Sequence, residues 1–139
     1  MKKITNTSLA YAIIAMLCGI TYRELTRFLE LTEPCTWSFT HTHFFVLGMF
    51  FFLIVLILEK QFSLTQDKKF KPFYFLYNIG LIITGIMLWI RGFADISNNF
   101  YVDYDKMISG ISGIGHILLG IGIILFFLIL KRRVKQEKI

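Results

Sequence analysis

Four long apolar runs constrain what this chain can fold into more than any other feature. They lie at residues 8–28, 39–58, 73–93 and 107–130. Each run is long enough to cross the ~30 Å hydrocarbon core of a bilayer. The backbone must satisfy its own hydrogen bonds there, so helices are the expected form. The sequence therefore predicts an all-α integral membrane protein, with residues 1–139 forming one domain of four transmembrane helices.

The composition and the placement of charge indicate the partner of this chain. Hydrophobic residues make up 55% of the sequence and charged residues 17%, which is atypical of a soluble domain. The formal net charge of +6 could indicate nucleic-acid binding, but the basic residues flank the apolar runs, where they orient a chain in the membrane. We therefore expect a lipid bilayer, and not nucleic acid, as the partner.

The segments between the apolar runs alternate in charge, and this alternation predicts an orientation. The first and third connections are acidic, whereas the second connection and the C-terminal tail are basic. By the positive-inside rule, both termini are expected in the cytoplasm of a bacterium and the acidic connections outside its plasma membrane. Four aromatic residues are then expected near the outer interface: Trp37, Trp89, Tyr101 and Tyr104.

Ionisable side chains gather in the outer half of the predicted spans. Placing an arginine at the centre of a transmembrane helix costs ~2.5–3.5 kcal/mol on insertion scales, so ionisable residues in a span indicate a function. His116 is expected ~14 Å below the outer end of the last helix, and Asn78 is the main polar residue of the inner half. This asymmetry favours a site over a continuous ion path. The remaining members of the outer cluster are Arg23, Glu24, Arg27, His41, His43 and Arg91.

The H-x-H pair of His41 and His43 is the most specific part of this cluster. Residues two apart on a helix point ~200° apart, so the two rings are expected to serve different sites. A neutral imidazole is a good axial ligand for haem iron, and Arg23, Arg27 and Arg91 could bind the propionates. Hydrogen bonding at the interface is the plain alternative. His116 is open to three roles: a further ligand, a hydrogen-bonding partner of the site, or a contact between helices.

Small residues recur at helical spacing in the first and last spans. They allow another helix to approach closely or leave space for a flat ligand, and helix packing is the favoured interpretation. The stripes are Ser8, Ala12, Ala15 and Gly19 in the first span, and Ser112, His116 and Gly120, with Gly113 nearby, in the last.

Three segments resemble the catalytic subunit of haem-copper oxidases. The stretch from His41 to Phe52 resembles its tenth helix, where an H-x-H carries the haem ligands. The segment from Trp89 to Asp95 is similar to the turn whose arginines bind haem propionates, and residues 108–134 resemble the twelfth helix. The chain also resembles an uncharacterised family of small four-span bacterial membrane proteins, which brings no known activity.

The oxidase resemblance implies an assembly. That subunit arranges twelve helices in three arcs of four, and this chain would match one arc. Three copies would rebuild the ring as a homotrimer, with His41 of each copy paired with a neighbour's His43 across one haem. Copper is the alternative metal, but the family's copper site needs three further histidines and a tyrosine. Because one chain offers only His116, copper is not supported and no oxidase activity is expected.

Three functions follow from these observations. The leading hypothesis is a membrane b-type haem protein that transfers electrons or senses redox state or haem, with a donor and acceptor that the sequence does not identify. A small transporter of haem, a metal or another cation is the second, although the sequence has no inverted repeats and no broken helices inside the spans. A non-catalytic structural or regulatory membrane subunit is the third. The chain carries none of the nucleophile, phosphate-loop or metalloprotease motifs that would indicate catalysis.

Overall fold

The computed structural model of the protein describes residues 1–33, 35–96 and 104–137, and its elements are all helical. Four spans are long and apolar enough to cross a membrane, so the expectation of a multi-pass membrane protein is confirmed at that level. The spans are α1 (Lys2–Phe28), a composite second span (Trp37–Phe62), α4 (Phe70–Ile96) and α5 (Asp105–Glu137). The composite span consists of α2 (Trp37–His43), a π-helix η1 (Phe44–Phe50) and α3 (Phe51–Phe62), and a 3₁₀ turn η2 (Leu64–Gln66) follows it.

The helices run beyond the apolar ranges from which they were predicted. Helix α1 begins at Lys2 rather than at residue 8, and α5 continues through the basic tail to Glu137. Lysine, arginine, glutamine and glutamate are good helix formers, so the backbone stays helical after the apolar run has ended. Pro72 lies in the first turn of α4, where its missing N–H removes no helical hydrogen bond. Hydropathy therefore indicated the apolar part of each helix and not where the helix begins and ends.

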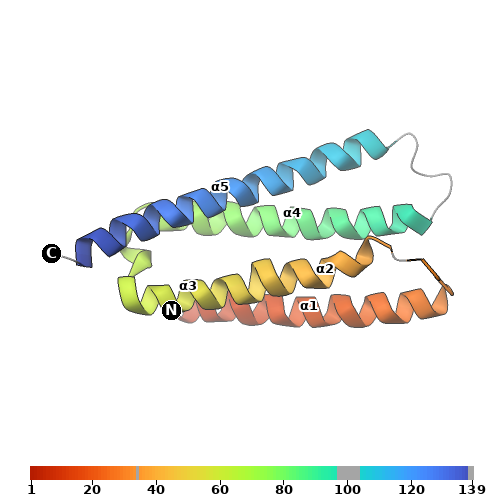
Figure 1. Ribbon diagram of the computed structural model, residues 1–139, viewed down its shortest axis with the longest axis horizontal. Helices are drawn as coiled ribbons and strands as arrows, with labels where there is room; N and C mark the ends of the chain where they lie inside the picture. Colours follow the sequence, from red (N-terminus) through yellow and green to blue (C-terminus); the bar gives the residue numbers. More distant parts are fainter. Residues whose placement is uncertain (34, 97–103, 138–139) are drawn as a thin grey trace.

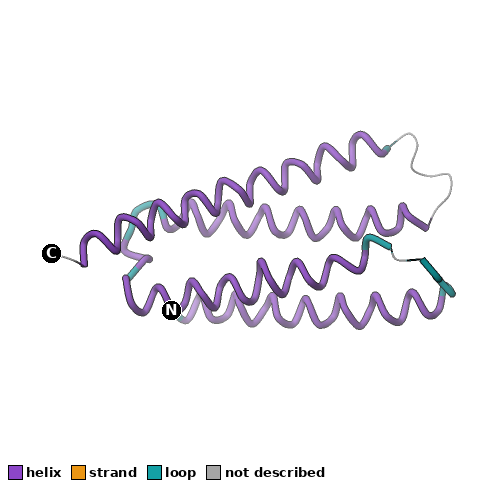
Figure 2. The backbone as a smooth tube through the Cα atoms, in the orientation of Figure 1, coloured by secondary structure: helices purple, strands orange, loops and turns teal. Residues whose placement is uncertain are grey.

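The spans lie side by side in chain order, as Figure 1 and Figure 2 show. The composite span packs against α1 on one side and α4 on the other, and α4 packs along α5. Within the described residues, α1 makes no close backbone contact with α4 or α5. The helices thus form a row with α1 and α5 at its edges, in which α5 also contacts α3 of the composite span. We call the end with both chain termini the basic end, and the opposite end, where α2 begins, the histidine end.

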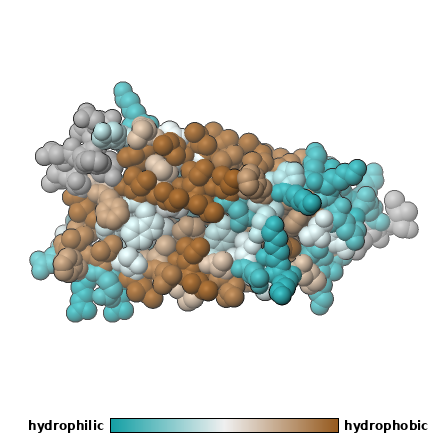
Figure 3. All heavy atoms as spheres, turned by 180° about the vertical axis from the view of Figure 1, so that it is seen from behind, coloured by the Kyte–Doolittle hydropathy of each residue, from teal (hydrophilic) through white to brown (hydrophobic). Residues whose placement is uncertain are grey.

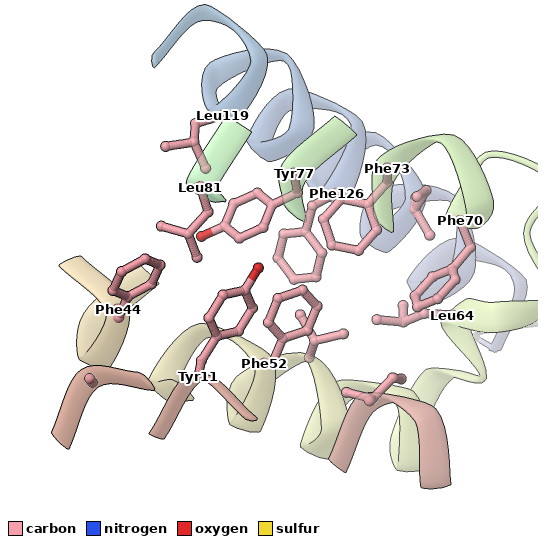
Figure 4. Close-up of a cluster of buried hydrophobic side chains, with 14 residues drawn as sticks. Tyr11, Phe44, Phe52, Leu64, Phe70, Phe73, Tyr77, Leu81, Leu119 and Phe126 are labelled. Atoms are coloured by element: carbon pink, nitrogen blue, oxygen red, sulfur yellow. The ribbon is translucent and has the colours of Figure 1, made fainter. Parts of the chain in front are cut away.

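An aromatic core holds the row together, and Figure 4 shows how its rings interleave. Phe52, Phe73 and Tyr77 are fully buried between the composite span and α4. Phe126 of α5 packs its ring 5.3 Å from that of Phe51, which in turn stacks 4.3 Å from Tyr77. Figure 3 shows the complementary outer surface, with hydrophobic residues over the middle and hydrophilic residues gathered at the ends.

The turn between the composite span and α4 is fixed by a buried carboxylate. Glu59 accepts hydrogen bonds from the backbone N–H of Thr65 at 2.8 Å and from its hydroxyl at 2.6 Å. Arg132 of α5 forms an ion pair with Asp67 of the same turn at 3.2 Å. These contacts tie the basic ends of α3, α4 and α5 to one another.

The π-helix η1 is a local departure from regular α-helix inside the composite span, which stays helical from Trp37 to Phe62. Its wider turns alter the normal hydrogen-bond ladder, and hydroxyls from two other helices bind carbonyls of this segment. The hydroxyl of Tyr77 donates to the carbonyl of Leu47 at 2.8 Å, and that of Ser8 donates to the carbonyl of Met49 at 2.9 Å. Gly48 faces the ring of Tyr11, where an added Cβ would come within 2.6 Å. The π-helix is therefore held in place from both sides.

Of the two predicted stripes of small residues, the one in α1 packs against another helix, whereas part of the one in α5 does not. In α1, Ser8 and Ala15 are buried against the composite span, as helix packing predicts. In α5, the face packed on α4 is a different one, which includes Gly115 and Gly122. An added Cβ at Gly120 would meet nothing within 4 Å, so that side of the predicted α5 stripe is an open surface of the chain.

Candidate functional site

Helix α2 presents the two histidines, and its start is anchored on α4. The backbone N–H and the hydroxyl of Thr36 both donate to a carboxylate oxygen of Asp95, at 2.7 and 2.5 Å. Trp37 donates its indole N–H to the carbonyl of Trp89 at 2.9 Å, and its ring fills the space opposite Gly92. This anchoring fixes the position of α2 before the H-x-H begins.

The position of Trp37 corrects its predicted role as an interfacial anchor. The side chain is only 1% exposed, because the missing Cβ of Gly92 lets the ring pack inward between α2 and α4. Trp89 is half-buried beside it, with ring centroids 5.4 Å apart. Tyr101, for which the same role was predicted, and Asp103 of the third connection lie outside the described residues.

His41 points toward α1. Its ring stacks on Tyr22 with centroids 6.5 Å apart, and an added Cβ at Gly19 would lie 3.7 Å from the Cβ of His41. Its Nδ1 is buried and has no hydrogen-bond partner among the described residues. The Nε2 lies 3.5 Å from the hydroxyl of Thr42. The side chain of His41 is thus half-buried, and its Nδ1 is shielded from solvent.

His43 has different neighbours and a defined tautomer. Its Nδ1 lies 2.8 Å from the carbonyl oxygen of Phe39. Because a carbonyl can only accept, Nδ1 carries a proton, and in the neutral imidazole Nε2 then has the lone pair that can bind a metal. The ring lines a small cavity of about 210 Å³ together with Thr42, Val46 and Leu47. The two histidines therefore face different surroundings, in keeping with their ~200° separation on a helix.

His116 of α5 has the same local arrangement as His43. Its Nδ1 lies 2.8 Å from the carbonyl oxygen of Ser112, so in the neutral ring Nε2 is again the nitrogen with the lone pair. The side chain is exposed on the open face of α5. The backbone thus sets the tautomer of this ring too, and no described contact joins it to His41 or His43.

The three arginines lie at the histidine end but are engaged elsewhere or exposed. Arg91 donates to the hydroxyl of Ser109 at 3.2 Å and forms an ion pair with Asp105 at 3.1 Å, which holds the start of α5 beside α4. Arg23 lies 3.8 Å from the carboxylate of its neighbour Glu24, with both side chains largely exposed. Arg27 is exposed in the last turn of α1.

Within the described part of a single chain, the histidines and arginines predicted to bind haem do not come together in one site. No group of three or more His, Cys, Asp or Glu side chains is close enough to hold a metal ion within residues 1–33, 35–96 and 104–137. The candidate ligands instead lie on separate surfaces of the histidine end. A cofactor there would need a second contributor.

A polar network at the basic end was missed by the sequence interpretation, which singled out Asn78 alone. The hydroxyl of Tyr11 donates to the side-chain oxygen of Asn78 at 2.7 Å, and the Asn78 amide donates to the carbonyl of Tyr74 at 2.6 Å. The hydroxyls of Thr7 and Tyr74 are also hydrogen-bonded. The spacing of four between Thr7 and Tyr11, repeated by Tyr74 and Asn78, is the signal that could have revealed it.

Two cavities adjoin at this network, between α1 and α4, and we call them together the α1–α4 groove. Their volumes are about 610 and 620 Å³, and both are lined by Lys3, Tyr74, Asn78 and Ile82. They are larger than the cavity at His43 and lie at the opposite end of the spans. The groove is therefore a separate feature from the histidines.

Comparison with known proteins identifies a family and nothing finer. Residues 1–133 match the family described as protein of unknown function (DUF2871). No curated protein and no solved structure matches the chain. The comparisons thus provide no link to haem-copper oxidases, and the likeness to one of their arcs stands on the residues alone.

Proposed function

We propose that this chain, which belongs to the DUF2871 family, binds haem b in the membrane through His41 and His43, and transfers electrons or senses redox state or haem. The observation that carries the proposal is the imidazole of His43. Its Nδ1 is committed to the Phe39 carbonyl, which leaves Nε2 free at the surface of an apolar span. This is the arrangement found in histidines that bind metals, where the second nitrogen is oriented by a backbone carbonyl or a carboxylate.

The chemistry of the donors fits a bis-histidine haem. His41 contributes a buried Nδ1 without a partner, and because its ring lies against Tyr22 of α1 in the same chain, the ring would have to rotate to reach a haem shared with a neighbour. A haem held by His41 and His43 would supply one-electron redox chemistry, and because both imidazoles would serve as ligands, oxygen reduction is not proposed. In this chain the Phe39 carbonyl orients the ring of His43, whereas the ring of His41 has no such hydrogen bond at Nδ1.

The cavity at His43 is too small for one chain to enclose a haem there, so haem binding at His43 would need a second copy. Its volume of about 210 Å³ is below the ~300–1,000 Å³ of typical ligand pockets. The spans form a row with free edges at α1 and α5, and three such rows could close into a ring of twelve helices. We therefore propose a homotrimer in which His41 of one copy and His43 of the next copy ligate one haem.

The distribution of charge supports two further parts of the proposal, the binding of the haem propionates and the orientation of the chain in the membrane. Three arginines at the histidine end could bind the haem propionates: Arg23, Arg27 and Arg91. Arg91 would then release its ion pair with Asp105 and bind a propionate instead. The basic residues at the opposite end favour a cytoplasmic location for both termini. The haem would then lie near the outer face of a bacterial plasma membrane.

An absorption spectrum of the purified chain tests this function. After expression with sufficient haem, we expect a Soret band and the sharp visible bands of low-spin haem. His41→Ala and His43→Ala should each abolish the low-spin spectrum, because each removes one axial ligand. Thr42→Ala is the matched control between them and should keep it. The proposal is wrong if no Soret band appears even after haem is added, or if both histidine variants retain the wild-type spectrum.

A further inference from the structure

The α1–α4 groove lies between two helices whose described backbones are not in close contact. Helices α1 and α4 make no close backbone contact within the described residues, and side chains alone bridge them. The bridges are Tyr11 to Asn78 and Thr7 to Tyr74. Asn78 also donates to the Tyr74 carbonyl, so the polar groups of the floor already have partners. A ligand of the groove does not need to satisfy them.

The mouth of the groove is cationic. Lys2 and Lys3 line it from α1, and Lys71 lines it from the first turn of α4. The ammonium of Lys3 lies 4.2 Å from the centre of the Tyr74 ring, a cation–π contact that holds it over the groove. No acidic side chain is among the described residues that line either cavity. The mouth is therefore complementary to an anion.

The walls beyond the mouth are apolar and extend along the spans. Ile14 and Ile82 continue the groove away from the lysines, and both are exposed in the chain. Ile14 is the eleventh residue after Lys3, which corresponds to about 16 Å along a helix. This length is close to half of the ~30 Å hydrocarbon core, the depth of one leaflet. A ligand with one charged end and one apolar chain would fit both parts.

We propose that the α1–α4 groove binds one anionic phospholipid. The lysines at the mouth hold its phosphate, and one acyl chain lies against the isoleucines between α1 and α4. The lipid would fill the groove between the two helices and would link them at the basic end. This site is independent of haem, so either proposal can fail without the other.

Competition between two lipids tests the proposal. The full chain in detergent is mixed with equal amounts of phosphatidylglycerol and phosphatidylcholine that have the same acyl chains, and bound lipids are counted by native mass spectrometry. We expect one retained lipid per chain, with a clear excess of phosphatidylglycerol. The double variant Lys3→Gln, Lys71→Gln should reduce that excess by about fivefold for each lysine removed.

Matched controls separate the groove from general surface charge. Lys60 and Lys131 are exposed lysines of the same end that do not line the groove. The double variant Lys60→Gln, Lys131→Gln should therefore keep the preference. An equal loss in both double variants would overturn the proposal, and so would the absence of any preference in the wild-type chain.

A second pair of variants tests the apolar part. Ala10 lines the groove, and Ala10→Phe should fill it and lower the retention of both lipids while the lysines remain. Leu9→Phe, at a neighbouring exposed position outside the lining, should have no effect. Unchanged lipid retention in Ala10→Phe would contradict the proposal. The same spectra report the number of chains, and loss of an oligomer rather than of lipid would assign the groove to a second copy.

Discussion

At the residue scale, glycines of α4 determine how closely aromatic rings of the composite span approach it. An added Cβ at Gly85 would lie 2.2 Å from the ring of Phe44, well inside van der Waals contact. Gly85→Ala should therefore lower the free energy of unfolding by about 1–3 kcal/mol, the usual cost of overpacking. Unfolding by denaturant in detergent measures this change.

Gly113→Ala is the control for that prediction. An added Cβ there would meet nothing within 4 Å, and alanine is the better helix former by about 0.5–1 kcal/mol. The variant should be as stable as the wild type or slightly more stable. Equal destabilisation by the two alanines would show that contact with Phe44 is not what matters at Gly85.

His116 provides a second prediction at this scale. It shares the tautomer of His43 but lies on α5, whereas the proposed ligands both lie on α2. His116→Ala should therefore leave the low-spin spectrum of the purified protein unchanged. Loss of that spectrum in His116→Ala, with His41→Ala retaining it, would transfer the ligand role from His41 to His116.

Sequence reasoning at the residue scale succeeded where local geometry decides the outcome. The different surroundings of His41 and His43 follow from helical spacing, and α2 is a regular helix at that point. It failed for Trp37, whose inward position depends on Gly92 in another helix. The ion pair of Arg91 with Asp105 also depends on how two distant helix ends meet.

At the element scale, the π-helix η1 should depend on the hydroxyls that bind its carbonyls. Tyr77→Phe removes the donor to the Leu47 carbonyl. We expect a loss of about 0.6–1.7 kcal/mol in the free energy of unfolding, the range for such hydrogen bonds in membrane proteins. The control is Thr21→Val, because the Thr21 hydroxyl donates to a carbonyl of its own helix. A similar loss in both variants would contradict a specific role for Tyr77.

The four spans could be predicted because length and hydropathy decide whether a segment crosses a membrane. The π-helix could not, because nothing within residues 44–50 distinguishes it from a regular apolar helix. It requires Ser8 and Tyr77 from other spans and the close approach of Tyr11 to Gly48. Those contacts exist only after the helices have packed.

At the scale of the whole molecule, the row of spans leaves α5 with an open face. Gly120→Leu would add bulk where nothing else in the chain lies within 4 Å of a Cβ. If copies meet at this edge, the variant should remain folded but lose the trimer, as measured by its mass in detergent. Ile86→Phe adds bulk on the exposed side of α4, inside the row, and should keep the trimer. An unchanged mass in both variants would place the contact elsewhere.

The assembly is the level that the sequence predicts least directly. Apolar runs specify spans but not which edges of two copies meet. The proposal of a trimer therefore depends on the separation of the two histidines, on the free edges of the row and on the size of the cavity at His43.

The ratio of haem to chain in the purified oligomer tests the central claim most directly. Haem shared between neighbours predicts, by native mass spectrometry in detergent, a complex of three chains that carries three haems. Gentle dissociation to single chains should release the haem, because each chain would then supply only one of its two ligands. A single chain that retains haem, or a complex that contains none after haem has been added, would contradict the account.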